Sequence, residues 1–185
     1  MFKKSLTSIF FFIIFFSNSF SDEKKLIIDK LINTNNITFD FTQITNDKKE
    51  LGSCVLLFDD KIKCNYKDTA QKEILINGKT LVIRQKTYNK IFFYPLSKSP
   101  FINIFNKKNL INLINKSKFT LKKNIELTYI DENEKEILIF FNRIDYDFVG
   151  WRVIDQLQNK IDFSIKIRNI NSKINPKDFI IPSIN

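Results

Sequence analysis

Short segments in which apolar and polar residues alternate fill most of this 185-residue chain, and they limit its fold more than any other feature. In the segment 36–43, Ile37, Phe39 and Phe41 alternate with polar residues. A period of two predicts a strand with one buried face. Roughly ten such segments occur, and up to residue 96 only turn residues separate them. Strands joined in this way pair antiparallel, and a sheet of this size must curl. We therefore expect a mainly β fold whose curled sheet has a concave face.

The N-terminal 21 residues have the layout of a secretory signal peptide. Two lysines precede the apolar run 9–16, and small residues stand at Ser19 and Ser21, so we expect cleavage between Ser21 and Asp22. The alternative is a membrane anchor, but such an anchor needs about 20 apolar residues. Residues 22–185 then form one exported domain that is large enough for its own core.

Two turns set the pairing of neighbouring strands. Asn77-Gly78 is the strongest hairpin signal in the chain. Asp59-Asp60 joins two further strands, and a loop of three residues there places Cys54 directly opposite Cys64. At that spacing a disulfide can form, as the oxidising compartment of an exported protein favours. A loop of two residues puts the cysteines out of register, and the alternative is then a pair of buried thiols.

Two segments have helical periodicity. The segment 22–35 has apolar residues at helical spacing and acids in its first turn, which predicts an amphipathic helix. The segment 97–117 interrupts the strands, with Ser99 as N-cap and Pro100 as the first helical residue. One face of this second helix carries Phe101, Ile104 and Phe105.

The residue types argue against catalysis and against nucleic-acid binding. The chain has no histidine, which removes the commonest general base and metal ligand. Its glycines are isolated and its paired acids lie in turns, where acids are common. Lys and Arg number 30 against 20 Asp and Glu, but the lysines are scattered along the chain. The aromatic content is high, with 20 phenylalanines. A binding function for an apolar ligand therefore suits the chain better than an enzymatic one.

The motifs of this chain resemble those of the periplasmic outer-membrane lipoprotein carriers, the LolA-like family. The resemblance covers nearly all of residues 22–185. The matching pieces, in chain order, are the N-terminal helix, "FDFTQ", "LGSCVLLFDDKIKCNY", "ILINGKTLVI", "YPLSKSPFINIF" and "GWRVIDQLQNKIDFSIKIRNINSKINPKDFIIP".

The resemblance implies an unclosed antiparallel half-barrel of ten to eleven strands, with an N-terminal helix and a central helical lid over the concave face. It also implies a monomeric periplasmic carrier without cofactor that shields the acyl chains of lipoproteins. The implied partners are acylated lipoproteins, an inner-membrane ABC lipoprotein-release transporter and an outer-membrane lipoprotein receptor.

The resemblance also places the site residues. An acyl-chain cavity is expected from Phe39, Phe41, Leu56, Phe58, Ile76, Leu81 and Ile83, and a lid from Pro100, Phe101, Ile104 and Phe105. The family usually has Arg-Pro at the tip of the first hairpin, where the arginine helps to latch the lid. This chain has Phe58-Asp59 there, so its latch must be different or absent.

Three alternatives stay open. The same fold could carry another apolar cargo, such as a glycolipid or free lipid. The chain could be a non-catalytic envelope protein with a fully packed interior that binds a partner. An exported enzyme is the third alternative, and it needs a cluster of acids that the sequence does not reveal.

Overall fold

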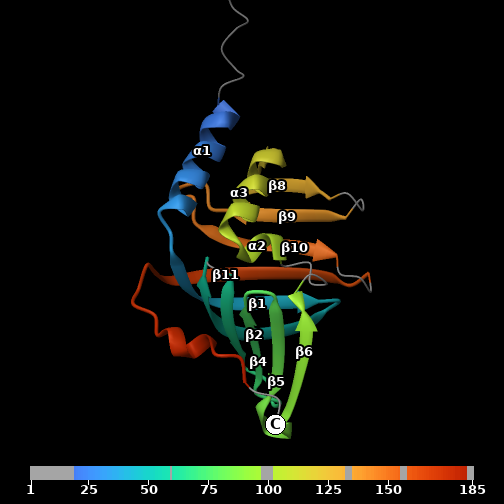
Figure 1. Cartoon of the computed structure of the whole chain (residues 1–185). Helices are drawn as coiled ribbons and strands as arrows, with labels where there is room; N and C mark the ends of the chain where they lie inside the picture. Colours follow the sequence, from blue (N-terminus) through green and yellow to red (C-terminus); the bar gives the residue numbers. More distant parts are fainter. Residues whose placement is uncertain (1–18, 59, 97–101, 132–134, 155–157, 183–185) are drawn as a thin grey trace, which may run out of the picture.

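The computed structural model describes residues 19–58, 60–96, 102–131, 135–154 and 158–182. These residues form one antiparallel sheet of eleven strands that is not closed into a barrel, with helices against one face (Figure 1). The predicted mainly β half-barrel is therefore confirmed. The strands are β1 (Asn36–Thr45), β2 (Lys48–Leu57), β3 (Lys61–Tyr66), β4 (Lys72–Asn77), β5 (Thr80–Gln85), β6 (Lys90–Pro95), β7 (Lys118–Leu121), β8 (Ile125–Ile130), β9 (Glu136–Phe141), β10 (Phe148–Ile154) and β11 (Lys160–Ile170).

The strand order is β6-β5-β4-β3-β2-β1-β11-β10-β9-β8-β7. Hairpins build each half of the sheet, and the pairing of β1 with β11 joins the two halves. The edges of the sheet are therefore β6 and β7, and the chain between these two strands contains the helices α2 (Ile102–Phe105) and α3 (Lys107–Lys116). In the part of the chain that is described, no helix has the length and apolar character that a bilayer-spanning helix needs.

The two faces of the sheet have different coverings. The concave face carries the main core and packs against α2, α3 and the N-terminal helix α1 (Ser19–Ile32). Ile27 and Leu31 of α1 are buried in this core, as their helical spacing predicted. A small second core lies on the convex face, where the 3-10 helix η3 (Pro176–Phe179) buries Phe179 against Leu75 and Val82.

Two local predictions need correction. The β4–β5 loop is Gly78-Lys79, one residue later than the predicted centre at Asn77-Gly78. Asn77 instead pairs with Thr80, while its side chain donates a hydrogen bond to the carbonyl oxygen of Phe179, and Gly78 takes the positive φ of 60° that the first loop residue requires.

The central helix was predicted as one segment, and the structure divides it at Asn106. This residue has extended backbone angles, and its side chain accepts a hydrogen bond from the backbone nitrogen of Asn109, so it caps α3. The predicted N-cap Ser99 and the lid residues Pro100 and Phe101 lie outside the described residues.

Candidate binding site on the concave face

The apolar floor of the concave face comes from rows of directly opposed residues on neighbouring strands. One row runs Phe39, Cys54, Cys64, Ile74 and Ile83, and the next runs Ile37, Leu56, Ile62, Ile76 and Leu81. Directly opposed residues point to the same face of a sheet. Six of the seven residues predicted for the cavity therefore share this face: Phe39, Phe41, Leu56, Ile76, Leu81 and Ile83. The seventh, Phe58, is buried in the β2–β3 loop.

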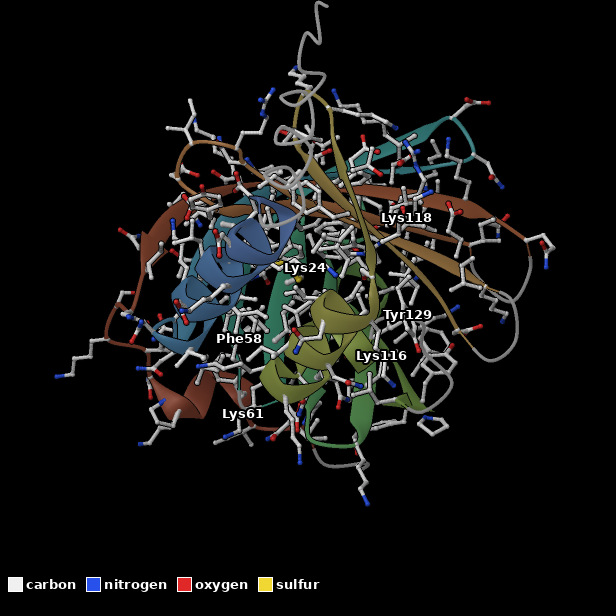
Figure 2. The ribbon with its side chains drawn as sticks, turned by 90° about the horizontal axis from the view of Figure 1, so that it is seen from above. Lys24, Phe58, Lys61, Lys116, Lys118 and Tyr129 are labelled. Atoms are coloured by element: carbon white, nitrogen blue, oxygen red, sulfur yellow. A yellow bond between two sulfur atoms is a disulfide. The ribbon has the colours of Figure 1, made fainter. Side chains whose placement is uncertain are left out.

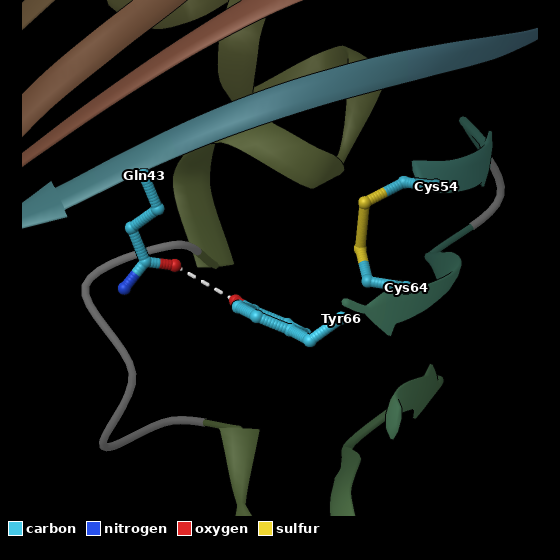
Figure 3. The surroundings of a disulfide bond; sticks show 4 residues. All are labelled: Gln43, Cys54, Cys64 and Tyr66. Atoms are coloured by element: carbon cyan, nitrogen blue, oxygen red, sulfur yellow. Dashed lines mark hydrogen bonds between the residues drawn. A yellow bond between two sulfur atoms is a disulfide. The ribbon is translucent and has the colours of Figure 1, made fainter. Parts of the chain in front are cut away.

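The disulfide between Cys54 and Cys64 is part of this floor (Figure 3). The β2–β3 loop comprises residues 58–60, the three-residue length that places the cysteines directly opposite each other. Both cysteines are buried, at 2% and 6% exposure. The bridge thus links two strands within the apolar surface and exposes no reactive thiol there.

An aromatic stack that the sequence analysis did not include lies next to this floor. The rings of Trp151 and Phe163 stack at 4.1 Å, and Phe41 stacks on Phe163 at 4.7 Å. Phe148 also stacks on the indole of Trp151, with the ring centres 5.6 Å apart. The alternation of apolar residues in β10 and β11 is the signal that could have placed Trp151 and Phe163 on the concave face.

Two glycines make room for this stack. A side chain at Gly52 would collide with the ring of Phe41, which lies directly over it. Gly150 has a φ of 146° and sits at an irregularity in the β9–β10 pairing, so Phe148 and Trp151 reach the same face despite their spacing of three residues.

Helices α2 and α3, which we call the lid, close over the aromatic stack. Phe105 meets Trp151 edge-to-face at 5.7 Å. Among the lid side chains that the structure describes, Ile104, Leu110, Leu113 and Ile114 are also buried. The predicted lid residues Ile104 and Phe105 are thus both in the core, with exposures of 0% and 7%.

The tip of the β2–β3 hairpin holds the start of α3. The side-chain nitrogen of Asn106 donates a hydrogen bond of 2.8 Å to Asp60 Oδ1. The ammonium of Lys107 lies 5.8 Å from the centre of the Phe58 ring, within range of a cation–π contact. These contacts occupy the position where the family's Arg-Pro latch was expected.

The end of α3 is held by helix α1. Lys24 Nζ donates to the carbonyl oxygens of Asn115 and Ser117, at 3.2 Å and 2.6 Å. A cation at this position complements the negative end of the helix dipole. Partial burial lowers the pKa of Lys24. Figure 2 shows Lys24 between the two helices.

Part of the concave face extends beyond the lid. Leu81 and Ile83 of β5 are only half-buried, and Phe92 and Tyr94, opposite them on β6, are 40% and 46% exposed. The concave face is therefore covered near β8–β11 and partly open near β5 and β6.

A polar group borders the floor near the β1–β2 end. The Tyr66 hydroxyl donates a hydrogen bond of 2.7 Å to Gln43 Oε1 (Figure 3). Lys72 lies 3.7 Å from the centre of the Tyr66 ring and forms an ion pair of 2.8 Å with Glu50. Burial, and then the negative charges of Glu50 and Asp68, raise the pKa of Tyr66.

Side chains fill the space between the lid and the sheet. Ile104, Leu110 and Trp151 have at most 1% exposure. A pocket between α1, β1 and β11 has a volume of about 20 Å³, which is room for about one water molecule. A hollow of about 640 Å³ lies between the β2–β3 loop and the start of α3, where Phe58, Asn106 and Ile111 line it, but it is open to the surface. A long apolar ligand beneath the lid would therefore require the lid to move.

Together these features define a class: an unclosed β half-barrel whose apolar concave face is partly covered by a helical lid. More particularly, the chain belongs to the family of the outer membrane lipoprotein carrier protein LolA, whose family model matches residues 32–182.

Two of the solved structures, with TM-scores just above 0.5, share the fold at low sequence identity. An uncharacterized conserved protein from Thermus thermophilus is 9% identical, with 89% of this chain and 95% of that chain covered and a TM-score of 0.51. MucB is 10% identical, with 90% and 64% covered and a TM-score of 0.52. A LolA superfamily protein from Nitrosomonas europaea is 10% identical, with 87% and 97% covered and a TM-score of 0.41. No curated protein matches this sequence.

Proposed function

We propose that this protein is a periplasmic carrier that binds the acyl chains of lipoproteins between its lid and its concave face. In this role it would receive lipoproteins from an inner-membrane ABC transporter and pass them to an outer-membrane receptor. The observation that carries the proposal is the apolar floor beneath a lid that packs on it through apolar side chains. Family membership supports a carrier rather than an enzyme.

The free energy needed to open the lid is comparable to the free energy gained when an acyl chain is buried. Lifting the lid exposes five buried apolar side chains among the described lid residues, each of which contributes roughly 1.5–3 kcal/mol, or about 10 kcal/mol together. An acyl chain of about 16 carbons regains about 12 kcal/mol when it is buried, at about 0.8 kcal/mol per CH₂. One or two acyl chains can therefore offset the opening, while the empty protein stays closed.

The small difference between these two free energies also favours release of the cargo. The floor offers dispersion contacts from aliphatic and aromatic side chains and few polar groups that would fix a particular cargo. When the cargo leaves, the lid closes again over its own core. The free energy of this apolar burial offsets much of the free energy lost with the acyl chains. Cargo transfer then requires neither a cofactor nor covalent chemistry.

The substitution Phe105→Asp tests the lid. A carboxylate facing Trp151 would be costly to bury against the apolar floor, so we expect pickup of acylated lipoprotein to be lost while the β-rich circular dichroism spectrum is retained. Asn112→Asp is the matched control, because it adds the same charge on the exposed side of α3. Normal pickup by the Phe105→Asp protein would contradict the proposed site.

Native mass spectrometry identifies the cargo. The protein is exported with its own N-terminal segment in a Gram-negative host and purified without detergent. A stoichiometric adduct that dissociates to an acylated lipoprotein supports the proposal. A free lipid or glycolipid adduct favours the alternative cargo. No adduct and no binding of an apolar dye favours a packed envelope protein that binds a protein partner, as MucB does in its complex with MucA.

A further inference from the structure

One end of the molecule carries exposed cations from three neighbouring segments. Lys116 ends α3, Lys118 begins β7, and Lys122 and Lys123 form the β7–β8 turn. Arg143, in the β9–β10 loop, donates a hydrogen bond to the Lys122 carbonyl oxygen and so lies beside that turn. We call these five residues the basic end. Figure 2 labels Lys116 and Lys118 on this side of the molecule.

The basic end is short of compensating charge. The sequence contains no acid from residue 102 to residue 125. Glu126 forms an ion pair of 2.7 Å with Lys122. It therefore compensates the charge of one of the five cations of the basic end. Asp145 is the exposed acid nearest to Arg143 in the chain, and its carboxylate accepts a hydrogen bond from the Asp147 backbone. Glu23 of α1 lies beside Tyr146 of the same loop, so three acids stand against the five cations and the net charge of this end is positive.

Apolar side chains project among these cations. Ile144, next to Arg143, is 89% exposed, which is the largest value among the exposed large hydrophobic residues described. Leu121, next to Lys122, is 46% exposed. Surfaces that lie on a lipid bilayer combine basic residues with apolar side chains in this way.

The N-terminal helix α1 borders the basic end. Lys24, near the start of α1, binds the carbonyl oxygens of Asn115 and Ser117, the neighbours of Lys116.

We propose that the basic end docks this protein onto the surface of a bilayer that contains anionic phospholipid. Lysines bind phospholipid headgroups as point charges, and Ile144 and Leu121 add shallow apolar contact. The docking surface lies outside the concave face and does not depend on the identity of the cargo.

Lysines on an exposed edge strand such as β7 also prevent edge-to-edge association, so this second explanation must be separated from docking. An acidic protein is the other partner that the charge would suit. Both explanations predict a basic surface, but neither predicts binding to protein-free vesicles.

Co-flotation with vesicles tests the proposal. The exported protein is mixed with vesicles of phosphatidylethanolamine and phosphatidylglycerol, or with vesicles of phosphatidylcholine alone. We expect binding to the anionic vesicles only, and loss of most of it at a salt concentration that shortens the Debye length to about 3 Å. The double substitution Lys118→Gln with Lys123→Gln should weaken binding about 30-fold, at roughly fivefold per lysine.

The matched control is Lys166→Gln with Lys173→Gln, which removes two exposed lysines from β11 and the segment after it and should leave vesicle binding unchanged. Equal loss in both double variants would overturn the assignment to the basic end. The docking proposal also fails if the protein ignores anionic vesicles but binds an immobilised acidic protein, or if the Lys118/Lys123 variant only self-associates. Phe105→Asp should still bind vesicles, so failure of the cargo proposal and failure of docking give different results.

Discussion

Tyr66 is a polar residue of the concave face whose protonation affects the stability of the fold. Its ring packs edge-to-face on Phe41 at 4.8 Å, and its hydroxyl is 2.7 Å from Gln43 Oε1. Burial is the main cause of its raised pKa, because the phenolate would lose most of its hydration there. The neutral phenol is therefore the form that the folded protein requires.

This requirement predicts an alkaline loss of stability. Below pH 10 the phenol is neutral in both states. Above pH 10 the unfolded chain loses the proton while the folded chain keeps it, so the free energy of unfolding falls as pH rises. We expect the wild type to lose about 1 kcal/mol more than Tyr66→Phe between about pH 9 and pH 11. Urea unfolding measures the difference, with Tyr88→Phe at an exposed position as control. Parallel losses in wild type and Tyr66→Phe would refute the assignment.

The constraint at Gly52 is steric, because any side chain at this position would collide with its neighbours. An added Cβ would lie 2.5 Å from two ring atoms of Phe41 and would also strike the Asn65 carbonyl oxygen. We expect Gly52→Ala to lower the free energy of unfolding by about 1–3 kcal/mol, the usual cost of overpacking. Gly78→Asn is the control, since its loop has free space and asparagine tolerates positive φ. A stability for Gly52→Ala equal to that of the control would show that the Phe41 ring can move aside.

At the scale of elements, the lid is a helix pair held to the sheet by its apolar face and tied at both ends. Asp60 binds the cap of α3 through Asn106, and Lys24 binds the carbonyl groups at its other end. Hydrogen bonds that involve a charged group stabilise by about 1.5–3 kcal/mol, less at partly exposed positions such as these. Such contacts can set how often the lid opens without deciding whether the sheet folds.

The substitution Asp60→Ala should therefore act locally. We expect backbone amides of α3 to exchange with solvent about fivefold faster, which corresponds to about 1 kcal/mol, while amides of β1 and β11 keep their protection. Binding of an apolar dye should increase in parallel. Asn112→Ala, on the exposed side of α3, serves as the control. Unchanged exchange in α3 would mean that the hairpin tip does not hold the lid.

At the scale of the whole molecule, the proposed binding of acyl chains would require separation of the lid from the aromatic stack. Trp151 is the single tryptophan of the chain, and it lies at this boundary, against Phe105 of the lid and Phe163 of β11. Its fluorescence therefore reports on the contact that must break.

We expect an acylated lipopeptide to change the emission of Trp151, because the ligand replaces Phe105 as the neighbour of the indole. The same peptide without acyl chains should leave the emission unchanged. Titration at several protein concentrations measures the effect. An emission spectrum that stays constant while the acylated peptide binds would place the cargo elsewhere, for example on the open surface of β5 and β6.

The sequence predicted what depends on near neighbours. A period of two located the strands and put Ile37, Phe39 and Phe41 on one face, because alternation is a property of the extended backbone itself. The hairpin between Cys54 and Cys64 was also predicted, but its loop could have had two or three residues, and the structure has three.

Tertiary structure alone decided the rest. The pairing of β1 with β11 joins residues more than 100 positions apart, and it brings Phe41, Trp151 and Phe163 into one stack that no local pattern specifies. The break between α2 and α3 likewise depends on Asn106, whose side chain caps α3 and meets Asp60 only because the folded hairpin tip lies there. Periodicity assigns a residue to a face, but the pairing of distant strands determines which faces meet and what they enclose.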